Sequence, residues 1–544
     1  MQTNILHKSY FQKLIFVLTL ILNALLVIIL FADLNDINTG HYLSSDMLYL
    51  PSIYKDLIID KSGLAGWNLN AAPNFLPDML VFFVIRSFFS NFIPACFTYT
   101  LLQILTLITL LAILYKLIFK NLNYIHLAFA SLLMGMFLLV YLVNHDFVYT
   151  FYILSISYHM GAFIMSILSF ILIFNFYTSE KNLHLILLFI VSLFSIINDR
   201  LFIVMFSIPV FSLLLVLALK KERKDLILKI LLSNLIALLL GLLIFNILRN
   251  SEYIYIINLS WKAFNFTNII PALKIFFEQH LFYISNLGFK GIIDILFIIS
   301  IITHFILLIQ NLLKAFKGKE HNRFELIYLL VFTSFLFVTL FAPIINGSYV
   351  SQAILRYNIY SLYAGVFSIG YLIYKIYSSY KLSLNYLTIL LVILIVTETT
   401  FIIKKISGQN IIKELSEFMN YYPEKVKCID DFSQKYNLKY GIAEYWDAKQ
   451  ITMLSKQNIR VYTVFDNLGA WYHVTNQNWF YKNGKGKYAN PEFNFVLTEK
   501  INKKDLIKNL GIPIDTLHCA NGTEIYLYPE FEFNKKTRKP TIIK

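Results

Sequence analysis

The sequence predicts a polytopic α-helical membrane protein with about eleven transmembrane helices and a small C-terminal α/β domain. Of its 544 residues, 58% are hydrophobic and only 15% are charged, whereas soluble domains carry about 25% charged residues. Apolar runs long enough to cross ~30 Å of hydrocarbon recur from Leu14 to Ile403. Much of the net charge of +15 lies in short loops between these runs. This placement is typical of cytoplasmic loops and argues against a nucleic-acid-binding face.

The first apolar run, 14–32, follows Lys8 and Lys13. It is longer than the apolar core of a cleaved signal peptide, about 7–15 residues, and no clear cleavage site follows it, so we predict a retained span. The remaining predicted spans are 96–119, 124–143, 160–177, 183–198, 201–219, 226–248, 291–313, 325–343, 357–376 and 385–403.

The run 79–93 is short, contains Arg86, and lies between Pro77 and Pro94. We predict an interfacial or re-entrant helix here, because six basic clusters then fall on one side of the membrane, as the positive-inside rule requires. These clusters are Lys8/Lys13, Lys116/Lys120, Lys181, 220–224, Lys314/Lys317/Lys319/Arg323 and Lys375/Lys381.

This topology predicts a multi-pass protein of the cell inner membrane with a cytoplasmic N-terminus. The predicted membrane domain is 1–403, and its long loops lie on the outer side. They include a first outer loop, 33–95, with interfacial helices, and a second long loop, 249–290. Because the long polar loops lie on the outer side of the membrane, we expect the functional site to lie on that side.

Residues 404–544 have the composition of a soluble domain, which the topology places in the periplasm. Periodicity predicts strands at 439–444, 459–465, 493–498 and 523–529 and helices at 446–456 and 502–510. Cys428 and Cys519 both lie here, and an oxidising periplasm would permit a disulfide between them, although two free thiols fit the sequence equally well. Cys96 lies in a predicted span, and we expect it to be inert.

The first outer loop contains four aspartates, in "GHYLSSDMLYLPSIYKDLIIDKSGLAGWNLNAAPNFLPDML". Asp46 has apolar neighbours close to the end of the first span, an environment that suits a general base; a turn or helix cap is the alternative. Asp56 and Asp60 lie four residues apart on a predicted helix, 52–60, beside Lys55 and Lys61. We expect those two carboxylates to form a solvated face.

The other candidates lie at predicted outer ends of helices. Asp78 follows Pro77 and is either a helix cap or a second acid beside Asp46. Asp199 and Arg200 occupy a tight turn, where they form a local salt bridge or meet an anionic substrate. Arg356 begins a span, where an arginine either snorkels to the interface or binds a phosphate.

The loop 249–290 contains a predicted amphipathic helix, in which 273, 276, 277, 280 and 281 share one face. Lys262, Lys274 and His280 could contact an anionic head group there, or simply anchor the helix. In the tail, aromatic residues surround His473 in "LGAWYHVTNQNWFYKNG". Such residues either stack on sugars or form a domain core.

The stretches "SSDMLYLPSIYKDL…GWNLNAAPNFLPDM", "SIINDRLFIVMFSIP" and "LRYNIYSLYAG", in this architecture, resemble the GT-C superfamily of polytopic glycosyltransferases. The chain is distantly similar to protein mannosyltransferases and aminoarabinose transferases. Their first loop carries an Asp-Glu pair where this chain has Asp46 and Met47, and their Arg-Tyr segment usually continues to a proline that is absent here.

The resemblance implies an inverting glycosyltransferase that moves a sugar from a polyprenyl-phosphate donor to an envelope lipid, glycan or protein on the outer face. Asp46 would deprotonate or orient the acceptor hydroxyl, and Arg356, with Arg200, would bind the donor phosphate. Asp78 and Asp199 are secondary acid candidates. Asp46 and Asp78 could also hold a divalent metal, although no ligand spacing requires one.

Three other functional classes fit parts of the sequence. A transporter or flippase for a lipid-linked glycan would be expected to show paired repeats and charged, broken helices, and the sequence shows neither. A polysaccharide polymerase or ligase is also polytopic with large outer loops, but does not need the tail domain. In a non-catalytic scaffold, the ionisable helix ends would have no chemical role.

Overall fold

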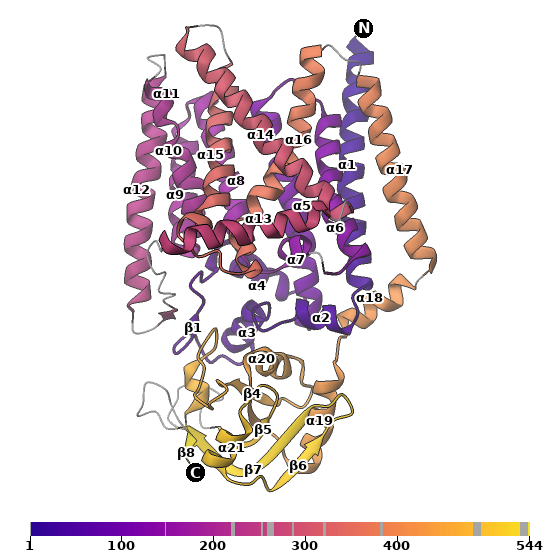
Figure 1. Ribbon diagram of the computed structural model, residues 1–544, viewed down its shortest axis with the longest axis vertical. Helices are drawn as coiled ribbons and strands as arrows, with labels where there is room; N and C mark the ends of the chain where they lie inside the picture. The colour runs from indigo at the N-terminus through magenta and orange to yellow at the C-terminus, as the bar shows by residue number, and fades with distance from the viewer. Residues whose placement is uncertain are drawn as a thin grey trace.

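The structure is a computed structural model that describes residues 2–146, 148–218, 223–251, 254–257, 266–285, 288–318, 322–380, 384–408, 410–481, 491–533 and 542–543. A bundle of long helices carries a small sheet-containing domain at one end (Figure 1). The N-terminus of the first helix lies at the opposite end of the bundle from this domain.

Nine helices of the described chain are long and apolar enough to cross a membrane. Two shorter apolar segments, α9 (Asn182–Asn198) and the run Ile203–Leu217, coincide with the other two predicted spans. Each of the eleven predicted spans therefore corresponds to helical structure. The nine long helices are α1 (Gln2–Ala32), α5 (Phe92–Ile118), α6 (Tyr124–Val143), α8 (Met160–Ser179), α12 (Lys224–Arg249), α14 (Phe289–Phe316), α15 (Arg323–Ile345), α16 (Ile359–Tyr380) and α17 (Leu384–Gly408).

The outer helices of the bundle expose apolar side chains along their length. Leu239 on α12, Ile302 on α14 and Val396 on α17 are each more than half exposed. A soluble protein rarely exposes apolar surface this continuous. The arrangement therefore suits helices that contact lipid, as the composition predicts.

The segment 79–93 does not form a spanning helix. It contains the short helix α4 (Leu80–Arg86), which follows the π-helical turn η2 (Phe75–Met79) and ends before α5 begins at Phe92. At 1.5 Å per residue, seven helical residues are about 10 Å long, far too short to cross a bilayer. The prediction of a non-crossing helix is confirmed.

Basic residues from the predicted inner clusters meet at one end of the bundle. The ammonium groups of Lys13 on α1 and Lys116 on α5 lie 5.7 and 5.4 Å from the centre of the Tyr124 ring, at the start of α6. This end is the one opposite the C-terminal domain (Figure 1). The predicted topology places Lys13 and Lys116 on the same side of the membrane, and this grouping agrees with it.

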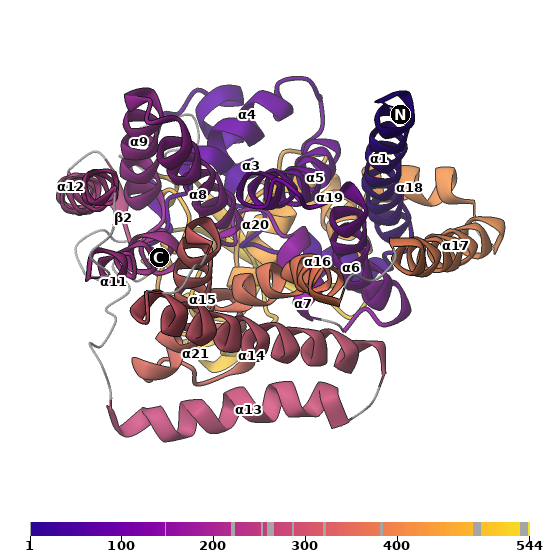
Figure 2. The same cartoon turned by 90° about the horizontal axis from the view of Figure 1, so that it is seen from above.

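The long loops at the other end of the bundle contain short elements. The first loop holds α2 (Asp36–Tyr42), α3 (Tyr49–Tyr54), η1 (Lys55–Ile59) and β1 (Asn68–Leu69). β1 pairs in parallel with β2 (Tyr255–Ile256), which joins the first loop to the second. The second loop also holds the predicted amphipathic helix, α13 (Ile269–Ser285), which lies across the long axis of the bundle (Figure 1) and outside α14 (Figure 2).

The C-terminal region folds as predicted into an α/β domain. Its sheet has the order β4-β3-β5-β7-β6, in which β4, β3 and β5 are parallel and β7 is antiparallel to β5 and β6. Cys428 and Cys519 form a disulfide that spans 91 residues of sequence. The elements are α18 (Ile411–Met419), α19 (Glu424–Tyr436), β3 (Tyr440–Ala443), α20 (Tyr445–Leu454), β4 (Arg460–Thr463), β5 (Phe493–Leu497), α21 (Lys503–Leu510), β6 (Asp515–His518), β7 (Glu524–Phe533) and β8 (Ile542–Ile543).

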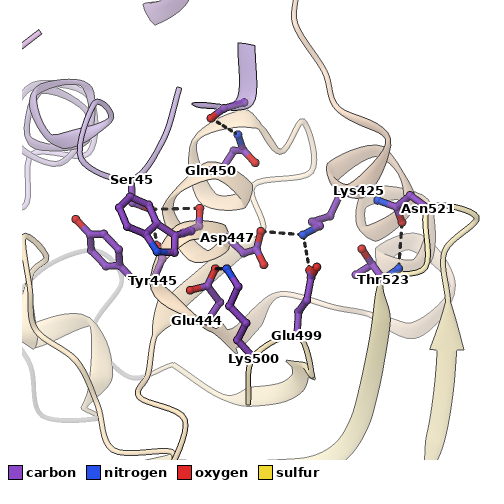
Figure 3. A network of polar contacts seen from close by, with 12 residues as sticks. Ser45, Lys425, Glu444, Tyr445, Asp447, Gln450, Glu499, Lys500, Asn521 and Thr523 are labelled. Atoms are coloured by element: carbon purple, nitrogen blue, oxygen red, sulfur yellow. Dashed lines mark hydrogen bonds and ion pairs between the residues drawn. The ribbon is translucent and has the colours of Figure 1, made fainter. Parts of the chain in front are cut away.

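The start of α20 packs against the first loop. The Ser45 hydroxyl donates to the Tyr445 carbonyl, and the Lys449 ammonium donates to the Ser45 carbonyl at 3.0 Å. Figure 3 shows Ser45 against Tyr445, with Gln450 reaching the loop one helical turn further on. On the other face of α20, Lys425 bridges Asp447 and Glu499. The interface thus places the N-terminal turn of α20 directly beside Asp46.

The expectation that Asp56 and Asp60 form a solvated face is wrong. Asp56 is buried and accepts hydrogen bonds from the Trp67 indole at 2.8 Å and from the Asn476 amide at 3.1 Å. Asp60 forms an ion pair with Arg460 at 2.6 Å, and each side chain is only 3% exposed. Both carboxylates therefore attach the first loop to the C-terminal domain, through partners that are 420 and 400 residues away in the sequence.

Candidate active site

A cavity of about 450 Å³ lies where the first loop, the helix ends and the C-terminal domain meet. Four residues singled out from the sequence line it: Asp46, Asp199, Arg200 and Arg356. Its other lining residues are Tyr49, Asn70, Ala71, Ala72, Ser157, Tyr158, His159, Leu201, Val204, Tyr357, His473 and Val474. The cavity therefore combines carboxylates, guanidinium groups and aromatic rings from all three parts of the chain.

Asp46 is held in place by two tyrosine hydroxyls. Tyr158, just before α8, donates to Oδ2 at 2.9 Å, and Tyr445, at the start of α20, donates to Oδ1. The backbone around Asp46 is turn-like, between α2 and α3, and the side chain is half-buried. Because each oxygen is bound from a different side, the carboxylate has a fixed orientation toward the cavity.

Arg356 and Arg200 line the same cavity as Asp46. Arg356 lies in a 3-10 segment, Gln352–Tyr357, and its guanidinium carbon is 5.1 Å from the centre of the Tyr357 ring. The Arg200 guanidinium lies 4.6 Å from the centre of the Phe245 ring. Within the described residues, neither arginine forms a salt bridge with a carboxylate. Their charge is therefore available to an anionic ligand.

Asp199 pairs with His159, not with its neighbour Arg200. The His159 Nδ1 atom is 2.6 Å from Asp199 Oδ2, and the backbone amide of Leu201 donates to Oδ1 at 3.0 Å. Burial alone would raise the pKa of Asp199, but His159 and this amide outweigh it and lower the pKa. The pair thus offers an imidazole oriented by a buried carboxylate, an arrangement suited to proton transfer.

Asp78 does not reach the cavity. It lies in η2, fully buried, and accepts a hydrogen bond from the Tyr99 hydroxyl at 2.5 Å. Gly161 on α8 makes room for it, because a Cβ atom there would lie 2.3 Å from Asp78 Oδ2. Burial raises the pKa of Asp78 to about 6. Asp78 therefore packs behind the cavity wall instead of facing the cavity with Asp46, and Asn74, not Asp78, precedes this helical turn as its N-cap.

The C-terminal domain contributes two basic residues beside Asp46. Burial lowers the pKa of Lys449 to about 7, with the charge of Asp46 partly opposing this effect. Burial, with Lys449 close by, lowers the pKa of His473 to about 4, so this imidazole is neutral at physiological pH. The His473 ring packs against Tyr445 and Trp471, with centroids 5.3 and 5.9 Å away.

The residues predicted to contact head groups have different positions. Lys262 lies outside the described residues. Lys274 on α13 is exposed and lies 3.7 Å from Glu278, one turn along the helix. His280 is a correction: it is buried, with Nδ1 at 2.6 Å from Asp294 on α14 and 3.1 Å from the Tyr149 hydroxyl. It therefore points into the bundle, away from lipid head groups.

Several site residues could not be recognised from local sequence. His159, Tyr158, Tyr445 and Lys449 have no motif around them, and Tyr445 is 399 residues from Asp46. The one usable signal was position, because His159 falls at a predicted outer helix end. The aromatic residues around His473 are visible in the sequence, but such residues are typical of both a domain core and a binding site.

The described residues do not fit a metal site at Asp46 and Asp78. Within the part of the chain that the structure describes, no group of three or more His, Cys, Asp or Glu side chains could hold a metal ion. Asp78 is also absent from the cavity lining. We therefore derive no catalytic step through a metal.

Comparison with protein-family models finds no match, and neither does comparison with curated proteins. The geometry of the site is therefore the basis for assigning a function.

Proposed function

We propose that the chain is a membrane glycosyltransferase that moves a sugar from a polyprenyl-phosphate donor to an envelope acceptor. The observation that carries this proposal is the cavity itself, which holds Asp46 together with Arg356 and Arg200 at one end of the helical bundle. A carboxylate and two guanidinium groups in one space suit a reaction that removes a proton and releases a phosphate. The resemblance to GT-C enzymes supports the same assignment.

In the proposed reaction, the Asp46 carboxylate takes the proton of an acceptor hydroxyl. The acceptor oxygen forms a bond to the anomeric carbon as the bond from that carbon to the phosphate oxygen breaks, which inverts the configuration. The bonding electrons leave with the lipid phosphate. Tyr158 and Tyr445 orient the carboxylate, since each donates to one of its oxygens.

Arg356 and Arg200 would bind the departing lipid phosphate. Arginine presents a planar set of donors that matches phosphate oxygens in a bidentate geometry, which lysine does not. The His159–Asp199 pair lies in the same cavity as Arg200 and offers a second proton acceptor. Comparing Asp46→Asn with His159→Gln would show which of the two groups takes the acceptor proton.

The test compares Asp46→Asn with Asp36→Asn. Asp36 belongs to the same loop but is exposed, so its variant controls for loss of a loop carboxylate. Cells lacking the chain are complemented with each variant, and their lipid-linked sugars and envelope glycans are measured by mass spectrometry. We expect Asp36→Asn to restore transfer and Asp46→Asn to reduce it at least about 100-fold, the scale of lost general-base catalysis. Full complementation by Asp46→Asn would remove Asp46 from the reaction.

The proposed orientation puts the C-terminal domain in the periplasm. Cys96 is buried and the other two cysteines are bridged, so the wild-type chain provides a low background for thiol labelling. We expect a membrane-impermeant maleimide to label cysteine at 504 but not at 181 in intact inner-membrane vesicles of right-side-out orientation. The opposite pattern would invert the topology.

Transport is a second candidate, because ionisable groups are buried within spanning helices. Asp294 on α14 accepts hydrogen bonds from His280 and Tyr149, and Glu398 on α17 is also buried. Both carboxylates lie within spans predicted from the sequence, 291–313 and 385–403, and carboxylates inside a membrane often mark ion or substrate pathways. If Asp46→Asn complements fully while Asp294→Asn does not, transport replaces transfer as the favoured function.

A further inference from the structure

A second cavity, of about 230 Å³, lies between the first loop and the C-terminal domain. It shares no lining residue with the cavity around Asp46. Its lining combines three basic side chains with uncharged polar and apolar groups: Pro51, Tyr54, Lys55, Ile59, Arg86, Ser90, Asn91, Phe92, Thr452, Met453, Ser455, Asn458 and Arg460. None of these described lining residues is a carboxylate.

The basic side chains come from three separate elements. Lys55 begins η1, Arg86 ends α4, and Arg460 begins β4. Lys55 and Arg460 share Asp60, at 3.4 and 2.6 Å, and Asp56 is buried close by. Asp430, which accepts a hydrogen bond from the Ser455 hydroxyl, is a third nearby carboxylate, and Lys456, next to Ser455, is a fourth basic group. Four basic groups against three carboxylates leave an excess of positive charge, so the cavity attracts an anion.

The backbone adds to this positive potential. Asn91 is the N-cap of α5, a helix of 27 residues, and both Asn91 and Phe92 line the cavity. The N-terminus of a helix has a partial positive charge and amide groups that bind phosphate readily. Arg86 donates to the carbonyls of Phe89 and Ser90, which holds its guanidinium beside this helix end.

The cavity lies at the depth where a lipid phosphate is expected. It is next to the first turn of α5, the point at which this span begins. Beside it, apolar side chains project outward from η1, α4 and the turn that follows, and Phe88 is 80% exposed. The exposed residues of this apolar strip are Ile58, Ile59, Leu80, Val81, Val84 and Phe88.

We infer that this cavity binds the phosphate of an anionic membrane lipid whose acyl chains lie along the apolar strip. Three basic groups and a helix N-terminus hold the phosphodiester, while the strip provides the hydrophobic contact that a free phosphate lacks. The cavity volume of about 230 Å³ is many times the ~10–15 Å³ that one water needs, which is enough for a head group. Because the cavity is formed jointly, the bound lipid would link the C-terminal domain to the membrane surface.

The test measures lipid retention by native mass spectrometry of the full chain in a detergent mixture with equal amounts of phosphatidylglycerol and phosphatidylcholine. We expect preferential retention of phosphatidylglycerol by the wild-type chain. Lys55→Gln and Asn458→Asp should each weaken it about fivefold, the contribution of one charge near an anionic lipid. Asn458→Asp keeps the side-chain shape and suits the left-handed backbone at this position, φ 56°.

The matched control is Gln457→Glu, which adds the same charge one residue away at an exposed position that does not line the cavity. It should retain phosphatidylglycerol like the wild type. Phe88→Ser, which removes a contact of the strip without changing charge, should weaken retention. Equal melting temperatures among the variants confirm that each is folded.

Three outcomes would overturn the inference. The first is equal retention of the two lipids by the wild-type chain. The second is unchanged retention in Lys55→Gln and Asn458→Asp. The third is complete displacement of phosphatidylglycerol by millimolar inorganic phosphate, which would make the cavity a free-phosphate site. None of these readouts depends on glycosyl transfer.

Discussion

Replacing Asp56 by Asn should stabilise the attachment of the C-terminal domain at neutral pH and change it little at acidic pH. Asp56 Oδ2 accepts hydrogen bonds from Trp67 and Asn476, while Oδ1 has no partner among the described residues. An asparagine can keep an acceptor oxygen in the Oδ2 position and place its amide nitrogen at Oδ1. The substitution therefore preserves shape and removes the ability to ionise.

The magnitude follows from the pKa of Asp56. Burial raises it from 3.8 to about 6, although Asn476, Trp67 and Arg460 favour the charged form. Because the pKa in the folded state is above the unfolded value, the folded state binds the proton more tightly. Wild-type stability therefore falls as pH rises from 3.8 through 6, by about 3 kcal/mol in total.

Asparagine removes this loss, and the pKa of about 6 already includes the hydrogen bonds that Asn476 and Trp67 donate to the charged form. The variant should therefore be up to about 3 kcal/mol more stable than the wild type at pH 8. At pH 3, where Asp56 is largely protonated in both the folded and the unfolded state, the two side chains are both neutral, and the stabilities should differ by no more than about 1 kcal/mol. The stability advantage of the variant therefore increases as pH rises through this range.

Urea unfolding in detergent, followed by tryptophan fluorescence, measures this difference. Four of the five tryptophans report on the loop and domain concerned: Trp67, Trp446, Trp471 and Trp479. Asp515→Asn, at an exposed position of the same domain, is the control and should track the wild type. A difference between Asp56→Asn and wild type that is constant with pH, or that decreases as pH rises, would refute the reasoning.

Three further perturbations test other contacts. Arg460→Met should lower the free energy of unfolding by about 3–5 kcal/mol, because it leaves Asp60 buried without its guanidinium partner. The double variant Arg460→Met/Asp60→Asn should recover most of this stability. An equal loss in the single and the double variant would contradict the prediction. Tyr445→Phe removes one hydrogen bond to Asp46. It should lower kcat about tenfold with little change in KM, because a positioning residue affects the geometry of the reacting groups. An unchanged kcat would exclude a positioning role for Tyr445. Reducing the Cys428–Cys519 disulfide, which closes a loop of 91 residues, should lower the free energy of unfolding of the domain by about 4 kcal/mol. A Cys428→Ser variant should show the same loss of stability and no further response to reductant.

The membrane-spanning segments could be predicted because hydrocarbon imposes a strong local rule. A span must satisfy its own backbone and present apolar side chains, so each run of about 20 residues is informative by itself. The strands and helices of the C-terminal sheet were also predictable from local periodicity. The interruption at Arg86 followed from the charge pattern of the whole chain, which fixes how many segments cross.

The site was less predictable because its contacts join distant residues. Asp46 was identified from its place after the first span, but its partner Tyr445 is 399 residues away. His159 and Asp199 are 40 residues apart, on different turns, and nothing in either local sequence indicates the pairing. The burial of Asp56 and Asp60 is unpredictable for the same reason. Adjacent lysines suggested solvent, whereas Arg460 and Asn476 bury both carboxylates.

The two tyrosines that hold Asp46 have a consequence for protein engineering. One belongs to the membrane bundle and the other to the C-terminal domain. Residues on both sides of the boundary at residue 403 therefore contribute to the candidate site. A hybrid that exchanges residues 404–544 alone would give Asp46 a neighbour selected for another protein. Exchanging 33–95 and 404–544 together would keep Asp46, Ser45 and Asp60 with their partners in the C-terminal domain. Tyr158 would stay in the recipient bundle, so libraries of chimeras should use recipients with a tyrosine at that position.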